Sequence, residues 1–141
     1  MSDPMEKKVV VWCGAFLRHG GRFLFVKRAP SSSWGRNQWH LAGGKMEWGE
    51  HPLKALRREV LEETGRTVSD IRLVGIDTMQ LIAKGAHYHV VQIVYSGACA
   101  GGAVKMSDEH TGYAWKTLDE ALGMDLVDNL REFITENRER I

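Results

Sequence analysis

The order of apolar and polar residues predicts that the chain begins with two paired strands. Residues 8–17 are rich in Val, Phe and Trp, which favour strands. Residues 22–27 alternate between polar and apolar side chains, as a half-buried strand does. The intervening His19-Gly20-Gly21 suits a tight turn, so we expect the two strands to form a hairpin.

The rest of the chain predicts strands mixed with helices. Residues 52–64 carry the clearest helical pattern. Weaker patterns predict a short strand at 39–41, longer strands at 71–82 and 87–95, and helices at 118–122 and from 126 to the end. Hairpin strands and packed helices together indicate an α/β sandwich. The length of 141 residues fits a single domain over residues 1–141, since domains typically take ~100–200 residues.

The helix expected at residues 52–64 separates an apolar stripe from a cluster of carboxylates. Pro52 suits the first turn, and Gly65 suits the position after the last turn, where a left-handed backbone closes a helix. On the helical period of about 100° per residue, the predicted buried stripe consists of Leu53, Leu56 and Val60. An adjoining arc, at spacings i, i+3 and i+4, consists of Glu59, Glu62 and Glu63.

This placement of negative charge is unfavourable for a helix that serves stability alone. Like charges at i, i+4 repel by ~0.2–0.5 kcal/mol, and a carboxylate in the last turn costs about 0.3–1 kcal/mol. A bound cation would offset both effects, and carboxylates without Cys or paired His select Mg²⁺, with Mn²⁺ as the alternative. The competing interpretation is a solvated acidic face that pairs locally with Arg57 and Arg58. The preceding Gly43-Gly44-Lys45 favours the metal site, because glycine-rich backbone lets N–H groups approach phosphate oxygens.

The spacing of these residues resembles the Nudix box. That pattern reads Gly, five residues, Glu, seven residues, Arg-Glu, an aliphatic residue, any residue, Glu-Glu, any residue and Gly. In GGKMEWGEHPLKALRREVLEETGR the fixed positions are Gly44, Glu50, Arg58, Glu59, Glu62, Glu63 and Gly65, and all of them match. The chain departs from the family at Arg66, where an aliphatic residue is usual, and at Ala42, where many members have Pro.

The resemblance implies a fold, a reaction and a set of metal ligands. The fold would be α/β, a Nudix-like α/β/α sandwich around a mixed, curved β-sheet. The reaction would be hydrolysis of a pyrophosphate bond in a nucleoside diphosphate derivative, with Mg²⁺ as cofactor. Glu59 and Glu63 would be the principal metal ligands, Glu62 would complete the cluster, and Gly43 is a further metal-site position. The later segment SDEHTGYAW resembles the loop that supplies an extra carboxylate, here Glu109.

The remaining roles that the resemblance implies concern proton transfer and support. Glu59 and Glu109 compete for the role of general base, and the sequence leaves both open. Arg58 would orient the carboxylates and pair with Glu50. Structural support for the site is expected from Gly44, Glu50 and Gly65.

Candidate substrate contacts lie on both sides of the box. Phosphate contacts are expected from Arg28 and Lys45, each of which could instead be an exposed charge. Trp34 or Trp48 could stack on a base, an interaction worth ~1–3 kcal/mol, and Tyr88 lies on a strand that could line the pocket. The alternative for all three aromatic residues is packing. The remaining tryptophans, which we expect in the core, are Trp12, Trp39 and Trp115.

Sequence markers of several Nudix subfamilies are absent downstream of the box. No Pro follows Pro52, although ADP-ribose hydrolases of the family often carry one, and residues 79–82 lack the Tyr of dinucleoside polyphosphate hydrolases. We therefore expect a (deoxy)nucleoside triphosphate as substrate, giving the monophosphate and pyrophosphate. A nucleoside diphosphate sugar is the first alternative, and a non-catalytic nucleotide-binding module is the second.

Composition excludes other classes of function. The chain has 19 Lys and Arg against 18 Asp and Glu, so we expect no binding of nucleic acid polymers through general basicity. No apolar stretch approaches the ~20 residues that span a membrane, and the first residues lack the apolar core of a signal peptide. Two cysteines, Cys13 and Cys99, do not make a disulfide framework. We expect a cytoplasmic protein that binds a small nucleotide. The sequence leaves open whether it is a monomer or a homodimer.

Overall fold

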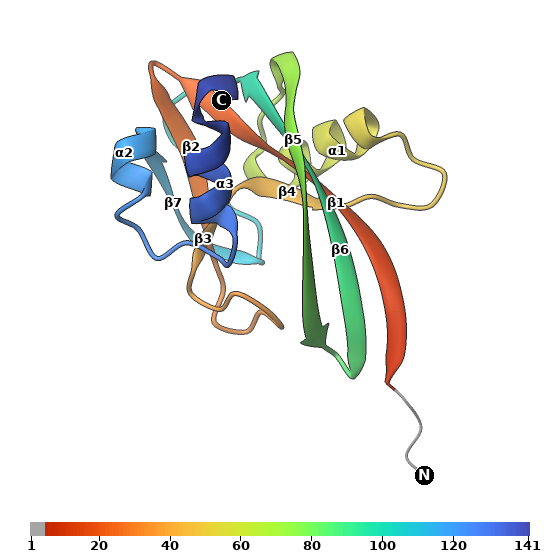
Figure 1. The fold of residues 1–141 in the computed structure, drawn as a ribbon. Helices are drawn as coiled ribbons and strands as arrows, with labels where there is room; N and C mark the ends of the chain where they lie inside the picture. The colour runs from red at the N-terminus through yellow and green to blue at the C-terminus, as the bar shows by residue number, and fades with distance from the viewer. Residues whose placement is uncertain (1–4) are drawn as a thin grey trace.

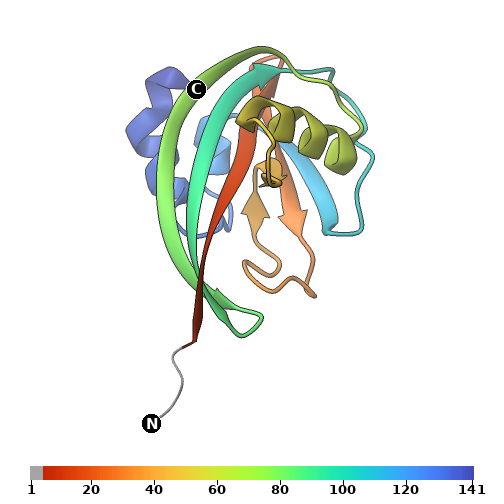
Figure 2. The same cartoon turned by 90° about the vertical axis from the view of Figure 1, so that its right-hand side faces the viewer.

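The computed structural model describes residues 5–141 and contains one seven-stranded sheet (Figure 1). The strands are β1 (Glu6–His19), β2 (Arg22–Arg28), β3 (Trp39–His40), β4 (Ala42–Lys45), β5 (Ser69–Ala83), β6 (Ala86–Ala98) and β7 (His110–Lys116). Neighbouring strands follow the order β3-β2-β1-β6-β5, while β4 pairs with β1 and β7 pairs with β2. The long strands β5 and β6 arch over the molecule and give the sheet its curvature (Figure 2).

The hairpin predicted at the start of the chain is confirmed. His19 faces Arg22 across β1 and β2, and Gly20 and Gly21 connect them with φ angles of 57° and 77°. A two-residue hairpin needs this left-handed backbone, which glycine adopts without steric cost. Strand β1 runs parallel to β6 and antiparallel to β2 and β4, so the sheet is mixed, as the resemblance implied.

Helices cover both faces of the sheet (Figure 2). They are α1 (Pro52–Thr64), α2 (Leu118–Ala121) and α3 (Leu130–Asn137), and α3 continues into a 3₁₀ turn, Arg138–Arg140. The strand residues Phe16 and Phe25 pack in one core with Phe133 of α3. Their neighbours Leu17 and Leu24 pack in the other core, which contains Leu56 and Val60 of α1. Alternate side chains along β1 and β2 therefore pack into two different cores, one on each face of the sheet. The expected α/β/α sandwich is confirmed.

Helix α1 has the bounds that the pattern predicts. It begins at Pro52, and the His51 side chain accepts a hydrogen bond from the backbone N–H of Leu53 at 3.1 Å. It ends at Gly65, whose left-handed backbone, with φ 71°, lets its N–H bond to the carbonyl of Leu61. The predicted stripe is wrong at Leu53, which is 37% exposed and belongs to neither core; Ala55 is buried instead.

Three other sequence predictions need correction. Residues 42–45 form β4, where the sequence pattern predicts no strand, because Gly43 and Gly44 allow close pairing with β1. Residues 110–116 form β7, which pairs with β2, where the sequence suggests a loop. The last helix starts at Leu130 instead of residue 126, because Leu126 bridges to Trp39 and Asn129 has a left-handed φ of 70°.

The structure of residues 5–141 also bears on the expectations for the cysteines, the tryptophans and a membrane span. Cys13 and Cys99 are free thiols, as expected. The tryptophans at positions 12, 39 and 115 are half-buried at the margins of the two cores rather than inside them. Within the described part of the chain, no helix has the length and apolar character needed to cross a membrane.

Candidate active site

Arg58 of α1 organises the carboxylates at the edge of the sheet. Its guanidinium binds Glu50 with two bonds, Nε to Oε2 at 2.8 Å and Nη2 to Oε1 at 2.9 Å, so the expected pair is present. Nη1 donates to Glu59 Oε1 at 2.8 Å, and Nη2 donates to the Lys45 carbonyl at 3.1 Å. The hydrogen bonds from Arg58 lower the pKa of Glu50 to about 2. Arg58 therefore ties the helix to the preceding loop and fixes the orientation of Glu59.

Glu63 lies one helical turn after Glu59 and is held from two sides. Its carboxylate accepts a hydrogen bond from the Gly43 N–H at 2.7 Å, and its other oxygen lies 3.2 Å from His110 Nε2. Glu63 is 4% exposed, and this burial raises the pKa of its carboxyl well above the usual value. Ser107 Oγ lies 3.1 Å from His110 Nδ1 and sets the orientation of the ring. These partners are the ones expected around a buried ligand carboxylate.

The two glycines of β4 make room for the carboxylates. A Cβ atom on Gly44 would lie 2.3 Å from the Glu59 carboxylate, and one on Gly43 would lie 2.5 Å from the Cys13 carbonyl. Glycine at these positions lets β4 pack against β1 and lets Glu59 lie over the strand. Burial raises the pKa of Glu59, although the hydrogen bond from Arg58 opposes this shift.

Glu59 and Glu63 open into a cavity of about 270 Å³ that we call the carboxylate cavity. Its wall also contains Glu109, which precedes β7 and whose charge raises the pKa of both helical carboxylates. The complete lining is Trp12, Arg28, His40, Leu41, Gly43, Gly44, Lys45, Glu59, Glu63, Glu109 and His110. Three acidic side chains from two distant parts of the chain thus meet around one space.

The carboxylate cavity suits a hard divalent cation. Among residues 5–141, no group of three or more His, Cys, Asp or Glu side chains is arranged so that it could hold a metal ion. Mg²⁺ does not require such a group, because it keeps several waters and is usually bound by one or two carboxylates together with substrate phosphates. The carboxylate donors are all oxygen, and burial, with a smaller effect from the neighbouring carboxylates, raises the pKa of Glu59 and of Glu63. The residues present therefore fit Mg²⁺ or Mn²⁺.

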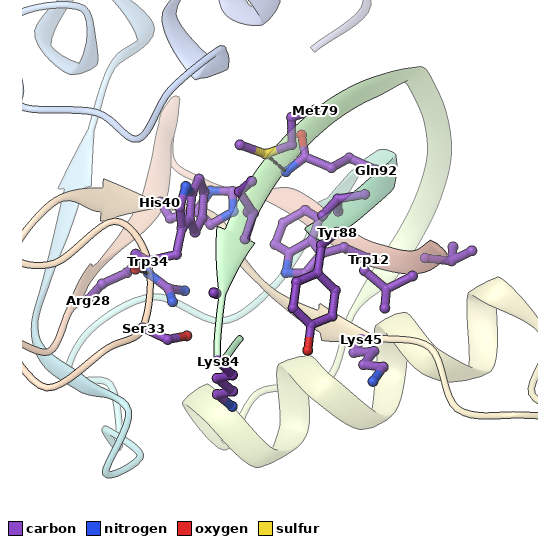
Figure 3. A pocket seen from close by; sticks show the side chains of 15 residues that line it. Trp12, Arg28, Ser33, Trp34, His40, Lys45, Met79, Lys84, Tyr88 and Gln92 are labelled. Carbon is purple, nitrogen blue, oxygen red and sulfur yellow. Dashed lines mark hydrogen bonds between the residues drawn. The ribbon is translucent and has the colours of Figure 1, made fainter. Parts of the chain in front are cut away.

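A second cavity, of about 240 Å³, adjoins the first and is lined mainly by aromatic and apolar side chains (Figure 3). We call it the aromatic cavity. Its lining residues include Trp12, Ser33, Trp34, His40, Met79, Leu81, Lys84, Tyr88, Val90 and Gln92. Arg28 and Lys45 line both cavities. Arg28 donates to the Trp34 carbonyl at 2.7 Å and lies 5.0 Å from the centre of the Trp34 ring, so it is fixed between the two spaces.

The structure brings most of the residues selected from the sequence into these two cavities. Arg28, Lys45, Trp34 and Tyr88 line the aromatic cavity. Glu62 lies outside both: its side chain is 58% exposed and bonds to Arg58 at 3.3 Å. Trp48 is fully exposed and borders a separate hollow beside Lys45 and Glu59.

Sequence reasoning missed three residues that the structure places at the site. Trp12, expected in the core, lines both cavities, and so does His40. His110 contacts Glu63. The only sequence signal for His110 is its place directly after Glu109, in the segment expected to supply an extra carboxylate. Nothing in the local sequence distinguishes His40 from an ordinary packed histidine.

Replacement of His110 is expected to weaken metal binding. A His110→Leu variant removes the contact to Glu63 Oε2 and leaves a buried carboxylate with one partner fewer. The Mg²⁺ concentration for half-maximal activity should rise by about 10–100-fold, the usual effect of losing such a partner. A Mg²⁺ titration checks this, with exposed His89 as the matched His→Leu control. An unchanged Mg²⁺ requirement in His110→Leu would contradict the assigned role.

Buried His40 is expected to make the fold sensitive to acid. Burial, with a smaller effect from Arg28, lowers the pKa of His40 to about 3 from its usual 6.5. The unfolded chain binds this proton below pH 6.5 and the folded chain does not, so stability is lost as pH falls from 6.5 towards 3. The slope for one proton is at most about 1.4 kcal/mol per pH unit. Urea unfolding near pH 7 and pH 5 should show a larger loss in the native protein than in His40→Leu, and equal losses would refute the assignment.

Sequence comparisons with known proteins agree on one family. The family model described as the NUDIX domain matches residues 7–136. A MutT-like protein of Streptomyces ambofaciens is 33% identical over 125 residues, which cover 85% of this chain and 74% of that protein. The nucleoside triphosphatase NudI of Escherichia coli O139:H28 is 28% identical over 123 residues, covering 78% of this chain and 83% of NudI.

Solved structures agree with the sequence comparisons. The MutT protein from Methanosarcina mazei Go1 superposes with a TM-score of 0.83 at 30% identity, and the match covers 96% of this chain and 97% of that one. The family model spans nearly all the described residues, and the box residues Gly44, Glu59 and Glu63 line the carboxylate cavity. The chain therefore belongs to the Nudix family and is a Nudix-type pyrophosphohydrolase.

Proposed function

We propose that the protein hydrolyses a (deoxy)nucleoside triphosphate, in the presence of Mg²⁺, to the nucleoside monophosphate and pyrophosphate. The observation that carries this proposal is that the carboxylate cavity and the aromatic cavity adjoin and share Trp12, Arg28, His40 and Lys45. A molecule with a polyanionic end and a flat heterocyclic end fits two such cavities. The relative NudI is itself described as a nucleoside triphosphatase, which supports the same substrate class.

The dimensions and chemistry of the cavities suggest how the nucleotide lies. The aromatic cavity of about 240 Å³ is smaller than the ~300–1,000 Å³ typical of ligand pockets, so it suits a base rather than a whole nucleotide. Stacking of the base on Trp34 or Trp12 would contribute ~1–3 kcal/mol. The cations Arg28 and Lys45, at the junction, are then placed to contact the phosphates.

In the proposed mechanism the chain holds a divalent cation and moves one proton. Glu59, Glu63 and Glu109 would hold Mg²⁺, with Mn²⁺ as the alternative. When bound, the ion would neutralise phosphate charge, polarise a phosphoryl oxygen and lower the pKa of water. Arg58 orients Glu59, and Gly43 fixes Glu63. Either Glu59 or Glu109 takes the proton from the water that attacks phosphorus.

Removal of divalent ions is expected to abolish turnover and leave the fold intact. The test is formation of the nucleoside monophosphate from a panel of nucleotides with Mg²⁺ or with EDTA, measured directly by chromatography, since a coupling pyrophosphatase would itself be inactive in EDTA. We expect the monophosphate with Mg²⁺, none with EDTA, and recovery when Mg²⁺ is restored, because the carboxylates alone repel a polyanion. Turnover that persists in EDTA would contradict the proposed metal site.

The same panel separates the alternatives. If phosphate appears only when a phosphatase that cleaves phosphomonoesters is added to reactions with nucleotide sugars, a nucleoside diphosphate sugar is the substrate. If no nucleotide is turned over with Mg²⁺ or Mn²⁺, the chain is a nucleotide-binding module without catalysis.

We also propose that this enzyme acts in the cytoplasm as one domain over residues 1–141. Free Cys13 and Cys99 favour a reducing compartment. Homodimer formation stays a prediction, which sedimentation of the purified protein would test.

A further inference from the structure

His40 is a buried polar residue without a partner. It lies at the end of β3 and is 5% exposed. Neither Nδ1 nor Nε2 has a hydrogen-bond partner, although both atoms are buried. Buried polar groups are almost always paired in folded proteins, so a ring with two unpaired nitrogens requires a physical explanation.

The surroundings of His40 belong to the aromatic cavity. The Trp12 ring stacks on the imidazole with centroids 4.5 Å apart and planes inclined by 11°. The Trp34 ring meets it edge-on at 5.8 Å. His40 belongs to the lining of both cavities, and Figure 3 shows it in the aromatic cavity. The two tryptophans thus fix the ring while its nitrogens have no protein partner.

The imidazole is neutral at physiological pH. Burial lowers the pKa of His40 to about 3, and the charge of Arg28 acts in the same direction. A neutral imidazole presents one N–H donor and one acceptor nitrogen. It therefore suits the polar edge of an uncharged heterocycle better than a phosphate, which prefers cationic donors.

A second polar group nearby is also poorly satisfied. The Gln92 amide is nearly buried, and its Nε2 donates to the sulfur of Met79 at 3.5 Å, a weak acceptor. Gln92 lines the aromatic cavity together with His40 (Figure 3). The cavity thus has apolar and aromatic walls and two polar groups that each can donate or accept. Such a combination is typical of sites that orient a flat, polar ligand.

We propose that His40 determines base specificity by forming a hydrogen bond with an edge atom of the nucleobase in the aromatic cavity. The inference rests on the proposed function, because it takes the substrate to be a nucleotide, and it adds which residue distinguishes one base from another. The unpaired nitrogens are costly in the free protein, and only a base with a matching donor or acceptor satisfies them. A base without that group leaves the site unpaired and is rejected.

The test compares His40 variants across nucleotides. The substrates are the eight common ribo- and deoxyribonucleoside triphosphates, together with the triphosphates of purine riboside, whose base has no exocyclic group, and of pyrimidin-2-one riboside, whose base has no substituent at C4. We expect native kcat/KM to differ by about 10-fold or more between the best and worst bases. His40→Leu should lose about 10–100-fold on the best base, mainly through KM, and little on the worst.

Two polar variants test the hydrogen bond itself. His40→Asn places an amide near the position of Nδ1, and His40→Gln places one near Nε2. We expect one of the two to recover part of the preference that His40→Leu loses. If neither recovers any of it, the proposed hydrogen bond is refuted. His89→Leu, on the exposed side of β6 and outside both cavities, is the matched control.

Stability and binding give readouts that a packing role would not produce. Since Leu removes two unsatisfied buried atoms, His40→Leu should melt at the same temperature as the native protein or higher. Quenching of Trp fluorescence on a Glu59→Gln background should show the same loss of base preference without turnover. A lower melting temperature together with unchanged preference would show a packing role and overturn the proposal.

Failure of this inference and failure of the proposed function can be told apart. If the native protein turns over nucleotides but His40→Leu keeps the native order of bases, the imidazole holds only a water and the inference is wrong. If the native protein turns over every base equally, the inference is also wrong, while the proposed function stands. If no triphosphate is hydrolysed or quenches the tryptophans, the proposed function itself fails.

Discussion

A Glu59→Gln variant is expected to lose activity by about 10³-fold while it keeps its fold, because Glu59 is either a metal ligand or the general base. The amide has nearly the same shape and its oxygen can still accept the bond from Arg58 Nη1. It cannot carry the negative charge that binds a cation or accept a proton from water. The measurement is kcat with saturating nucleotide and Mg²⁺, together with the melting temperature.

The control for this variant is another Glu→Gln change on an exposed helical face. Glu132 in α3 is exposed and lies far from the site in sequence, so Glu132→Gln should behave as the native protein. Near-native turnover of Glu59→Gln with Mg²⁺ would refute the assignment of this carboxylate. Glu62 provides a graded comparison, because its exposed side chain lies outside the cavity and its replacement should cost much less than that of Glu59.

Mg²⁺ titration separates the two candidates for general base. Loss of a metal ligand should raise the Mg²⁺ concentration that gives half-maximal rate, whereas loss of the base should lower kcat at every Mg²⁺ concentration. Glu59→Gln and Glu109→Gln are compared in the same experiment. The variant whose defect excess Mg²⁺ does not relieve identifies the proton acceptor.

A Gly44→Ala variant is expected to fold normally and lose about 10²-fold in kcat. The added Cβ would lie 2.3 Å from the Glu59 carboxylate, so that side chain must move away from its position beside Arg58. A displacement of about 1 Å at a reacting group can cost this much. The clash involves the end of a side chain rather than backbone, so the strand pairing should persist.

Alanine substitutions at two other glycines serve as comparisons for Gly44→Ala. Gly112 in β7 has open space, since its nearest neighbours would be 3.9 Å from an added Cβ, so Gly112→Ala should be silent. Gly43→Ala should impair folding, because its Cβ would lie 2.5 Å from the backbone of β1. Equal activity of Gly44→Ala and the native protein would mean that the position of Glu59 does not matter to the reaction.

The parts of the structure that could be predicted are those determined by neighbouring residues. Helix α1 was predictable because its proline, its terminal glycine and its apolar period all lie within one segment. The two-glycine hairpin is likewise a local signal. Arg58 and the carboxylates of the box could be identified because they all lie within residues 44–65.

The parts that could not be predicted depend on distant partners. Strand β7 is defined by its pairing with β2, about ninety positions earlier in the chain. The separation of Glu62 from Glu63 follows from the contact of Glu63 with Gly43 and His110, which only the fold brings together. The sequence predicts Trp12 as a core residue and does not single out His40, and only their place between the two cavities distinguishes them.

In the proposed reaction, water attacks the nucleotide and pyrophosphate leaves. The decisive measurement is phosphate release from the preferred nucleoside triphosphate with Mg²⁺, with and without inorganic pyrophosphatase. We expect no phosphate without pyrophosphatase and two phosphates per nucleotide with it, together with the nucleoside monophosphate. Phosphate released without pyrophosphatase, accompanied by the nucleoside diphosphate, would refute the proposed reaction.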